Sequence, residues 1–333
     1  MKKIVYIEVE TLDPTFNLAL EEYVFEQMPR ENEYFLTWRN DNAIIVGRHQ
    51  NTAAEINEEF VKAHNIKVVR RLSGGGAVYH DLGNLNFTFI VDAQPGQKVD
   101  LRRFCQPIAD TLCALGANAT VDGRNDILID GKKISGNAQY VRQGRVMHHG
   151  TILFDSDTSV LSQALKPDPT KVQAKGVKSV RSRVTTVRPC LREDMTLQEF
   201  RAALTDSLFR DSDFVRYELT EADIAAICSI QQERYARHEW NYGYCSEGAV
   251  VRRRRFDGCG TVEASISVEN GIITGLQFHG DYFSTLPPEE LAARFVGVSM
   301  TQEAILTALA GCGVSDYITG LSNEDLAALL TGF

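Results

Sequence analysis

Two adjacent arginines and a run of three glycines form the part of this sequence best suited to bind an anion. Residues 70–84 read RRLSGGGAVYHDLGN, so two guanidiniums, a triple glycine and a His-Asp pair follow one another closely. Glycine lets a main-chain N–H approach a phosphate or carboxylate, and guanidiniums add fixed positive charge. Strand-like runs at 66–69 and 85–91 flank the segment. We therefore predict an anion-binding loop held at strand ends, with a plain surface turn as the alternative.

This loop does not match the common nucleotide-binding motifs. In the G-x-G-x-x-G register that starts at Gly74, Tyr79 stands where the last glycine should be. A P-loop is also absent from the sequence, because Gly131-Lys132 is followed by Lys133 and not by serine or threonine. Both a dinucleotide dehydrogenase and a P-loop enzyme are therefore poor interpretations.

A lysine on a predicted hairpin is the second candidate for chemistry. Residues 126–130 and 133–141 read as strands on either side of a Gly131-Lys132 turn. If Ile134 faces the core, Lys133 and Ser135 share the opposite face, where a fixed ammonium can bridge a carboxylate and a phosphate. Spacing alone favours the alternative, a solvent-exposed hairpin lysine.

Two further segments carry polar or charged side chains of interest. His148 and His149 adjoin a strand, so one imidazole should enter a sheet face and the other point away. Neighbours on a strand cannot chelate one metal from the same face, which favours a hydrogen-bonded structural histidine. Residues 171–184 contain five basic residues and no acid. This basic segment is either a solvated face or a loop that covers a nucleotide or meets an acidic partner.

Composition limits the classes of function. A chain of 333 residues with 44% apolar content is long enough for a large core and a smaller second domain. Its net charge of −9 argues against general nucleic-acid binding. We expect a cytoplasmic protein without a membrane span, because no signal-like segment and no run of about 18 apolar residues occurs. Seven cysteines without C-x-x-C spacing predict reduced thiols and no structural zinc, with Cys105 and Cys113 in a helix core.

Hydrophobic periodicity predicts a mixed α+β fold in two domains. Asp13-Pro14 is expected to cap a helix that runs through residue 24, and an Asn270-Gly271 turn should join two strands. The other predicted helices are 56–65, 101–115, 197–209, 221–235, 286–295, 301–309 and 323–330. The other predicted strands are 43–47, 126–130, 133–141, 146–154, 261–268 and 272–278. We place a catalytic domain at 1–246 and an accessory domain at 247–333.

The motifs, taken in order, resemble the lipoate-protein ligase A family. They are RRxSGGGAVxHDxGN at 70–84, GRND at 123–126, KxSG at 133–136, HHGT at 148–151 and KGxxSVRSRV at 175–184. Further matches are DPxFNLA at 13–19, WR at 38–39, GRxQN at 47–51 and EWN at 239–241, so the likeness spans nearly the whole chain. It implies the mixed or antiparallel sheet shared with biotin-protein ligases and class II aminoacyl-tRNA synthetases, plus a small C-terminal α+β domain.

The resemblance also implies a two-step reaction. Lipoate and Mg-ATP would give lipoyl-AMP, and a lysine of a lipoyl-domain protein would then take the lipoyl group. Lys133 is the expected catalytic residue, contacting both the lipoyl carbonyl and the α-phosphate. Expected ATP or adenylate contacts are Arg71, Gly76, Ala77, Val78, Tyr79, Asn84, Asp126 and Lys133. Expected lipoate contacts are Arg70, Ser73, Gly74, Gly75, His80, Lys133 and His149.

Partners and alternatives follow from the same resemblance. The basic segment matches the family's adenylate-covering loop, through Lys175, Gly176, Lys178, Arg181 and Arg183. Expected acceptors are the E2 subunits of 2-oxoacid dehydrogenases and the glycine cleavage H protein, and Mg²⁺ is expected only with ATP, without a metal site of the protein's own. One alternative is an ATP-independent octanoyl or lipoyl transferase. Such an enzyme forms a thioester with a cysteine, and the matched motifs contain no cysteine. Another is a lipoate-binding relative without turnover.

Overall fold

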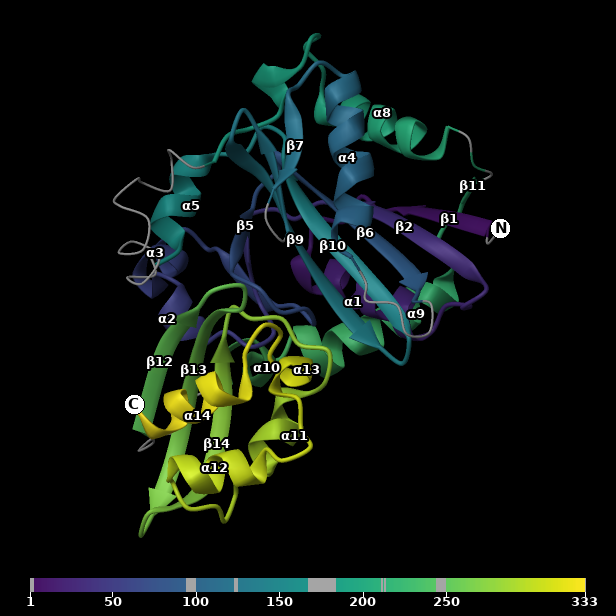
Figure 1. Cartoon of the computed structure of the whole chain (residues 1–333). Coiled ribbons are helices and arrows are strands. Elements are labelled where there is room, and N and C mark those ends of the chain that lie inside the picture. Colours follow the sequence, from purple (N-terminus) through teal and green to yellow (C-terminus); the bar gives the residue numbers. More distant parts are fainter. Residues whose placement is uncertain are drawn as a thin grey trace.

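The computed structural model describes residues 3–93, 100–122, 125–166, 184–210, 212, 214–243 and 250–332. The predicted domain boundary at 246/247 and most of the basic segment, residues 171–183, lie outside the described residues. The chain forms mixed sheets covered by helices and a separate C-terminal sheet (Figure 1), which confirms the predicted α+β class.

An eight-stranded mixed sheet is the centre of the N-terminal part. Its strands β1 and β2 pair in parallel, as do β1 and β11, and the remaining neighbours are antiparallel. In spatial order the strands are β11 (Phe214–Arg216), β1 (Lys3–Glu8), β2 (Asn32–Trp38), β6 (Asn84–Asp92), β10 (Arg145–Leu153), β9 (Lys132–Arg142), β8 (Asp126–Ile129) and β7 (Ala119–Asp122). The predicted meander of three strands between residues 126 and 154 is therefore confirmed as β8, β9 and β10.

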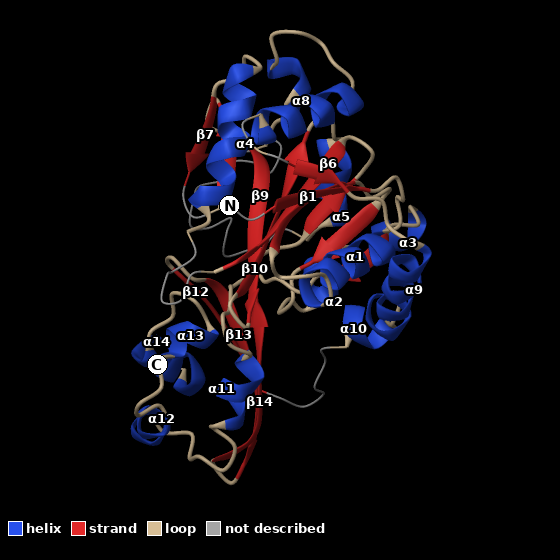
Figure 2. Ribbon diagram, turned by 90° about the vertical axis from the view of Figure 1, so that its right-hand side faces the viewer, coloured by secondary structure: helices blue, strands red, loops and turns tan. Residues whose placement is uncertain are grey.

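Helices cover both faces of this sheet (Figure 2). On one face, α1 (Pro14–Glu26) and α9 (Glu221–Ile230) pack against Ile7 and Leu36. On the other, α4 (Arg102–Ala114) and α8 (Leu197–Phe209) pack against Tyr6 and Phe35. Successive residues of β1 and β2 thus enter opposite cores, as the period of two in a strand requires. Other elements of this part are α2 (Thr52–Glu55), α3 (Glu58–Ala63), α5 (Thr158–Ala164), α10 (His238–Tyr242), a 3-10 turn (Arg188–Cys190) and a π-helical turn (Gln231–Tyr235).

A second, three-stranded sheet holds the glycine loop. Its strands β3 (Ala43–Val46), β4 (Lys67–Arg70) and β5 (Val78–His80) lie in the order β4-β3-β5. β3 is parallel to β4 and antiparallel to β5. Residues 71–77, which we call the glycine loop, connect β4 to β5 across β3. The sequence predicted β4, but β5 was not expected inside the 70–84 segment.

The C-terminal domain has its own sheet and core. It contains β12 (Val250–Phe256), β13 (Gly260–Glu269), β14 (Ile272–Gly280), α11 (Pro288–Ala293), α12 (Gln302–Ala308), α13 (Val314–Tyr317) and α14 (Asn323–Thr331). Asn270 and Gly271 both have positive φ, as the two-residue turn of a twisted hairpin requires, so the predicted turn is confirmed. The strand β12 was not predicted, because its four consecutive arginines give no apolar alternation.

Several predicted element ends are corrected by the structure. The helix expected at 56–65 is shorter and corresponds to α3 alone: Ile56 is extended after the end of α2, and Asn57 caps α3, which begins at Glu58. The helix expected from 286 begins at Pro288, where a missing N–H is tolerated in the first turn. Cys105 is buried as expected, but Cys113 is exposed at the end of α4. Among the described helices, none has the length and apolar content that crossing a bilayer requires.

The core predicts a pH dependence of stability. His148 is fully buried between the rings of Phe104 and Phe87, and burial lowers its pKa to about 3. Below about pH 6.5, His148 therefore binds a proton in the unfolded chain but stays unprotonated in the folded chain. The free energy of unfolding should fall as pH drops from about 6.5 toward 3, by up to about 1.4 kcal/mol per pH unit for this residue.

Urea unfolding of the wild type and His148→Phe at about pH 7.5 and about pH 5 measures this term. The variant should lose less stability on acidification than the wild type. Identical losses in both proteins would contradict the assignment of a neutral, buried imidazole.

Candidate functional site

A cavity of about 690 Å³ opens where the glycine loop, the β8–β10 strands and the C-terminal domain meet. This volume is in the range of small-molecule sites. Residues of these regions and of α1, β2, β3, β5, β6 and β7 form most of its wall. The lining residues are Leu18, Trp38, Ile45, Arg71, Gly75, Gly76, Ala77, Val78, His80, Asn86, Asp122, Asn125, Asp126, Leu128, Gly131, Lys133, Gly136, Asn137, Ala138, His149, Gly150, Thr151, Val184, Arg255, Asp281 and Phe283.

Arg71 organises the glycine loop from within. Its guanidinium is buried and donates to the carbonyl oxygens of Ile45 (3.1 Å), Gly74 (2.7 Å) and Gly76 (2.9 Å) and to Ser73 Oγ (3.0 Å). One side chain thus ties the loop to β3 and fixes the curve of the loop itself. The preference of guanidinium for several acceptors in one plane makes lysine a poor replacement.

The neighbouring arginine faces elsewhere. Arg70 is fully buried, and its guanidinium donates to the carbonyl oxygens of Gly47 (2.9 Å), Gln50 (2.7 Å) and Trp240 (2.8 Å). It does not line the cavity. The structure therefore separates the two adjacent arginines: Arg71 contacts the glycine loop at the cavity, and Arg70 joins the three-stranded sheet to α10.

The three glycines of the loop have different neighbours. A Cβ on Gly74 would lie 2.2 Å from the carbonyl oxygen of Tyr282, and the Gly75 N–H donates to the same oxygen at 3.2 Å. Gly75 also has a φ of +90°, which disfavours other residues. A Cβ on Gly76, in contrast, would have no described atom within 4 Å, so the main chain there faces open space. Gly74 and Gly75 thus allow the C-terminal domain to pack closely against the loop, whereas Gly76 leaves room for a ligand.

A chain of buried hydrogen bonds links the loop to two other side chains of the cavity wall. Ser73 Oγ lies 2.6 Å from His149 Nε2, and His149 Nδ1 lies 3.0 Å from Glu21 Oε1. Thr88 Oγ1 donates to Glu21 at 2.5 Å and accepts from Trp38 Nε1 at 3.1 Å. Because a carboxylate only accepts, His149 presents its Nδ1 proton to Glu21. This chain fixes two cavity-lining side chains, Trp38 and His149.

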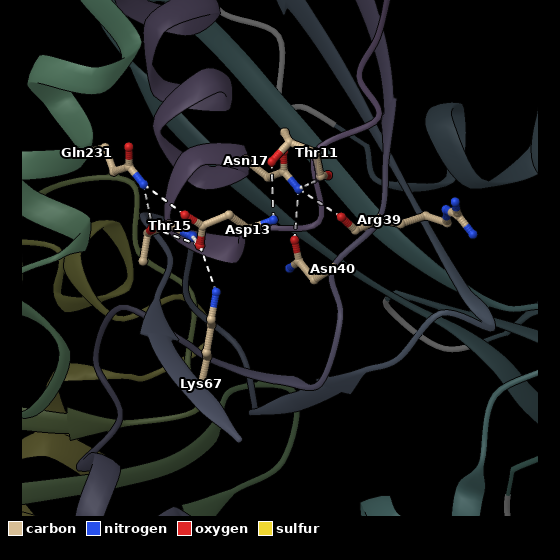
Figure 3. Close-up of polar contacts among 8 residues, drawn as sticks. All are labelled: Thr11, Asp13, Thr15, Asn17, Arg39, Asn40, Lys67 and Gln231. Atoms are coloured by element: carbon tan, nitrogen blue, oxygen red, sulfur yellow. Dashed lines mark hydrogen bonds and ion pairs between the residues drawn. The ribbon is translucent and has the colours of Figure 1, made fainter. Parts of the chain in front are cut away.

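The start of α1 is held by a second polar network (Figure 3). Asp13 caps the helix by accepting from the Thr15 N–H at 3.2 Å, and Lys67 and Gln231 contact the same carboxylate. Asn17 donates to the carbonyl oxygen of Arg39 at 2.8 Å and to Asn40 Oδ1 at 2.9 Å. These bonds fix the helix that carries Leu18 and Glu21 to the site.

The same network reaches the cavity through a histidine. Asn40 Nδ2 lies 3.1 Å from Nδ1 of the cavity-lining His80. Burial lowers the pKa of His80 to about 3, so its imidazole is neutral at physiological pH. His80 can therefore orient a ligand by hydrogen bonding but adds no charge.

Lys133, on β9, lines the same cavity as the glycine loop. Its ammonium pairs with Asp126 at 2.7 Å, and its backbone carbonyl accepts from the Thr185 N–H at 3.0 Å. The register of β8 and β9 shifts between Ile127 and Leu128, so an irregularity sits beside Lys133. Both Ile134 and Ser135 are buried, which differs from strict alternation. The ammonium is half-exposed, and its pair with Asp126 is weak enough to be exchanged for an anionic ligand.

Most of the residues that the sequence singled out converge on this cavity. Arg71, Gly75, Gly76, Ala77, Val78, His80, Asp126, Lys133 and His149 line it. Ser73 touches His149, Asn84 donates to the lining Asn86 at 3.0 Å, and Tyr79 points its hydroxyl to Asn42. Arg70 and Gly74 are used in packing as described above. Lys175, Gly176, Lys178, Arg181 and Arg183 lie outside the described residues.

Sequence reasoning missed other lining residues. Leu18 and Trp38 belong to motifs that were quoted, but nothing in the sequence indicated that they line a pocket. Arg255, Asp281 and Phe283 come from the C-terminal domain, and their approach to the glycine loop depends on tertiary packing. Only long-range contact information would have found them.

Comparison with known proteins identifies the family. The family model described as "Lipoyl protein ligase A/B catalytic domain" matches residues 13–209, and "Bacterial lipoate protein ligase C-terminus" matches residues 247–330. The chain belongs to the lipoate-protein ligase family. A relative with a similar sequence, the lipoate-protein ligase LplJ of Bacillus subtilis (strain 168), is 39% identical over 321 residues, which cover 96% of this chain and 97% of LplJ.

Solved lipoate ligase structures share the fold. LipL1 of P. falciparum in complex with lipoate has a TM-score of 0.79 at 22% identity, covering 99% of this chain and 98% of LipL1. A lipoate-protein ligase A bound with ATP has a TM-score of 0.63 at 27% identity, covering 72% of this chain and 98% of the other. A bi-partite ligase from Thermoplasma acidophilum, solved with its E2 lipoyl domain, has a TM-score of 0.64 at 28% identity and covers 74% and 98%.

Gly136 of the cavity wall offers a test of how Lys133 is placed. A Cβ on Gly136 would lie 3.0 Å from Lys133 Nζ and 3.1 Å from its Cε, while no backbone atom is close. Gly136→Ala should therefore move the lysine without unfolding the strand. We expect a melting temperature within a few degrees of the wild type and a loss of lipoate-dependent pyrophosphate exchange of about tenfold or more. Unchanged exchange would show that the observed position of the ammonium is not required.

Proposed function

We propose that this chain is an ATP-dependent lipoate-protein ligase. The lipoate carboxylate attacks the α-phosphate of ATP, which forms the mixed anhydride lipoyl-AMP and releases pyrophosphate. A lysine amine of a lipoyl domain then attacks the lipoyl carbonyl, and AMP leaves. The observation that carries this proposal is that the Lys133 ammonium and the open main chain at Gly76 face the same cavity. The family match and the ATP-bound relative support it.

The first half-step needs positioned positive charge more than a nucleophile from the protein. Negative charge on the lipoate carboxylate and on the α-phosphate must be brought together and then redistributed. Lys133 can contact both groups and offset that charge, giving up its ion pair with Asp126. The main chain from Gly76 to Tyr79 supplies donors for the nucleotide, and Arg71 keeps this main chain in shape.

The apolar end of the cavity suits the aliphatic chain of lipoate. Leu18, Trp38, Ile45, Val78 and Ala138 line it with carbon-rich surface. Burial of a chain of methylene groups contributes about 0.8 kcal/mol per group. Trp38 and His149 are fixed by the Glu21 hydrogen bonds, so this end of the cavity has a defined shape.

Mg²⁺ is proposed as the companion of ATP. No cluster of three or more metal-binding side chains occurs among the described residues. Mg²⁺ in nucleotide sites needs only one or two carboxylates besides phosphates and water, however, and Asp122 and Asp126 line the cavity. These carboxylates would hold the ion, which would offset phosphate charge.

The acceptor and the covering loop also remain proposals. Val184 lines the cavity and Thr185 binds the Lys133 backbone, so the end of the basic segment lies at the lysine. This placement supports an adenylate-covering role for Lys175, Gly176, Lys178, Arg181 and Arg183. Acceptors would be lipoyl domains of E2 subunits and the H protein, in keeping with the archaeal relative solved with its E2 lipoyl domain. Since the reaction consumes ATP, we place it in the cytoplasm.

The competing transferase reaction finds less support. A cysteine thioester would need a thiol at the cavity, and no cysteine of the described chain lines it. Burial also raises the pKa of the Cys105 thiol to about 12, which disfavours the reactive thiolate.

Lys133→Ala tests the proposed function. The variant should lose lipoate-dependent exchange of pyrophosphate into ATP by about 100-fold or more, because a charge that stabilises the transition state is removed. Lys132→Ala is the matched control, since Lys132 is the exposed preceding residue on β9 and does not line the cavity.

Mass spectrometry of an apo lipoyl domain, incubated with enzyme, lipoate and Mg-ATP, follows the complete reaction. Lys133→Ala should leave the domain unmodified and Lys132→Ala should not. Full activity of a folded Lys133→Ala protein would reject the assigned role, and absence of exchange in the wild type would reject the ligase itself.

A further inference from the structure

We infer that Arg255 of the C-terminal domain binds the β- and γ-phosphates of ATP. The inference rests on the proposed function and names a residue that the sequence did not single out. Arg255 lines the same cavity as Lys133 and Gly76, although it lies in a different domain. The C-terminal domain would thus bind the β- and γ-phosphates, and the N-terminal part of the chain would bind the reacting α-phosphate.

The position of Arg255 follows from its strand. β12 is an edge strand that pairs with β13 alone among the described strands, with Arg255 opposite Thr261 and Arg254 opposite Val262. Successive side chains of a strand point to opposite faces. Arg254 accordingly lies over the Phe256 ring at 5.4 Å and does not line the cavity, whereas Arg255 does. The two neighbours form a natural pair of test and control.

The guanidinium of Arg255 retains donors for a ligand. Among the described residues, its polar contacts are one long hydrogen bond from Nη1 to Thr261 Oγ1 at 3.4 Å and an approach of Nη1 to Asp281 Oδ2 at 3.9 Å. The second is too long for a hydrogen bond. Asp281 itself accepts from the Thr261 N–H at 2.5 Å, which keeps its carboxylate near Arg255. The carboxylate does not occupy all the N–H donors of the Arg255 guanidinium.

The other cations of the described cavity wall are already engaged. Arg71 donates to four acceptors inside the protein, and Lys133 is needed where carboxylate and α-phosphate meet. The triphosphate of ATP carries further charge that increases on the departing pyrophosphate. A planar guanidinium, with a side chain that is 37% exposed at the cavity, matches two phosphate oxygens well.

The described contacts between the two domains position Arg255, but Arg255 takes part in none of them. The Gly280 N–H donates to the His49 carbonyl oxygen at 2.7 Å, and the Gly75 N–H donates to that of Tyr282 at 3.2 Å. Within β12 it is Arg253, two residues earlier, whose guanidinium approaches Glu55 of α2 at 4.0 Å. Among the described contacts, Arg255 therefore has no task in docking the two domains, which leaves ligand binding as the role that its position supports.

Calorimetric titration of the full chain with two probes tests this subsite. Tripolyphosphate represents the β- and γ-phosphates, and AMP represents the part of ATP that lacks them. Arg255→Gln should weaken tripolyphosphate binding about tenfold, equivalent to about 1.4 kcal/mol, and leave AMP binding within about twofold. Arg254→Gln should leave both affinities unchanged. In pyrophosphate exchange, Arg255→Gln should raise the KM for ATP by a similar factor.

Three results would overturn the inference: tripolyphosphate binding that Arg255→Gln leaves unchanged, an equal loss of AMP affinity, or no tripolyphosphate binding by the wild type. Arg255→Lys keeps the charge without the fork and should fall between wild type and Arg255→Gln. The binding measurements need no turnover. Failure of lipoate-dependent exchange in the wild type would therefore count against the ligase function and not against the phosphate subsite.

Discussion

The buried guanidinium of Arg71 is the interaction on which the site depends. It holds the carbonyl oxygens of Ile45, Gly74 and Gly76 around one planar group, so the loop between β4 and β5 has a single shape. Burial lowers the pKa of Arg71 to about 10, opposed by the nearby Glu21, and the group stays charged at neutral pH. Burial of a charge is costly unless it is hydrogen-bonded, and here Arg71 donates four hydrogen bonds. Arg71 therefore sets the shape of the loop and also supplies one of the positive charges of the cavity wall.

Close packing around this loop joins the two domains at the cavity. Gly74 lies against the Tyr282 carbonyl oxygen, and a Cβ on Gly47 would approach the Gly75 carbonyl oxygen to 2.0 Å. The sequence suggested that the glycines of the loop contact a ligand. The structure shows that close contact between backbones also requires glycine, at Gly74 and at Gly47. Because the C-terminal domain rests on the loop itself, its side chains Arg255 and Phe283 reach the cavity wall. The domain is consequently part of the site and does more than cover it.

Local signals in the sequence predicted much of the fold and part of the site. Asp13-Pro14 defines the start of α1, Asn270-Gly271 defines a hairpin, and the spacing around Lys133 predicts the strands that present it. Residue type and spacing could not show that Arg71 lines the cavity and Arg70 does not, because only the packing around β3 and α10 distinguishes them. Glu21 reads as an ordinary residue of an amphipathic helix, yet it anchors His149 across 128 positions. Such pairings depend on sheet order, which residue types and periodicity do not encode.

We propose that the glycine loop binds the nucleotide in a shape set by the several acceptors that Arg71 engages, and not by its positive charge alone. Calorimetric titration of Arg71→Lys with AMP tests this claim most directly, with near-ultraviolet circular dichroism to confirm that the variant is folded. Lysine keeps the charge but cannot reach the same set of carbonyl oxygens. We predict that AMP affinity falls at least about tenfold in the folded variant. An affinity equal to that of the wild type would contradict the claim.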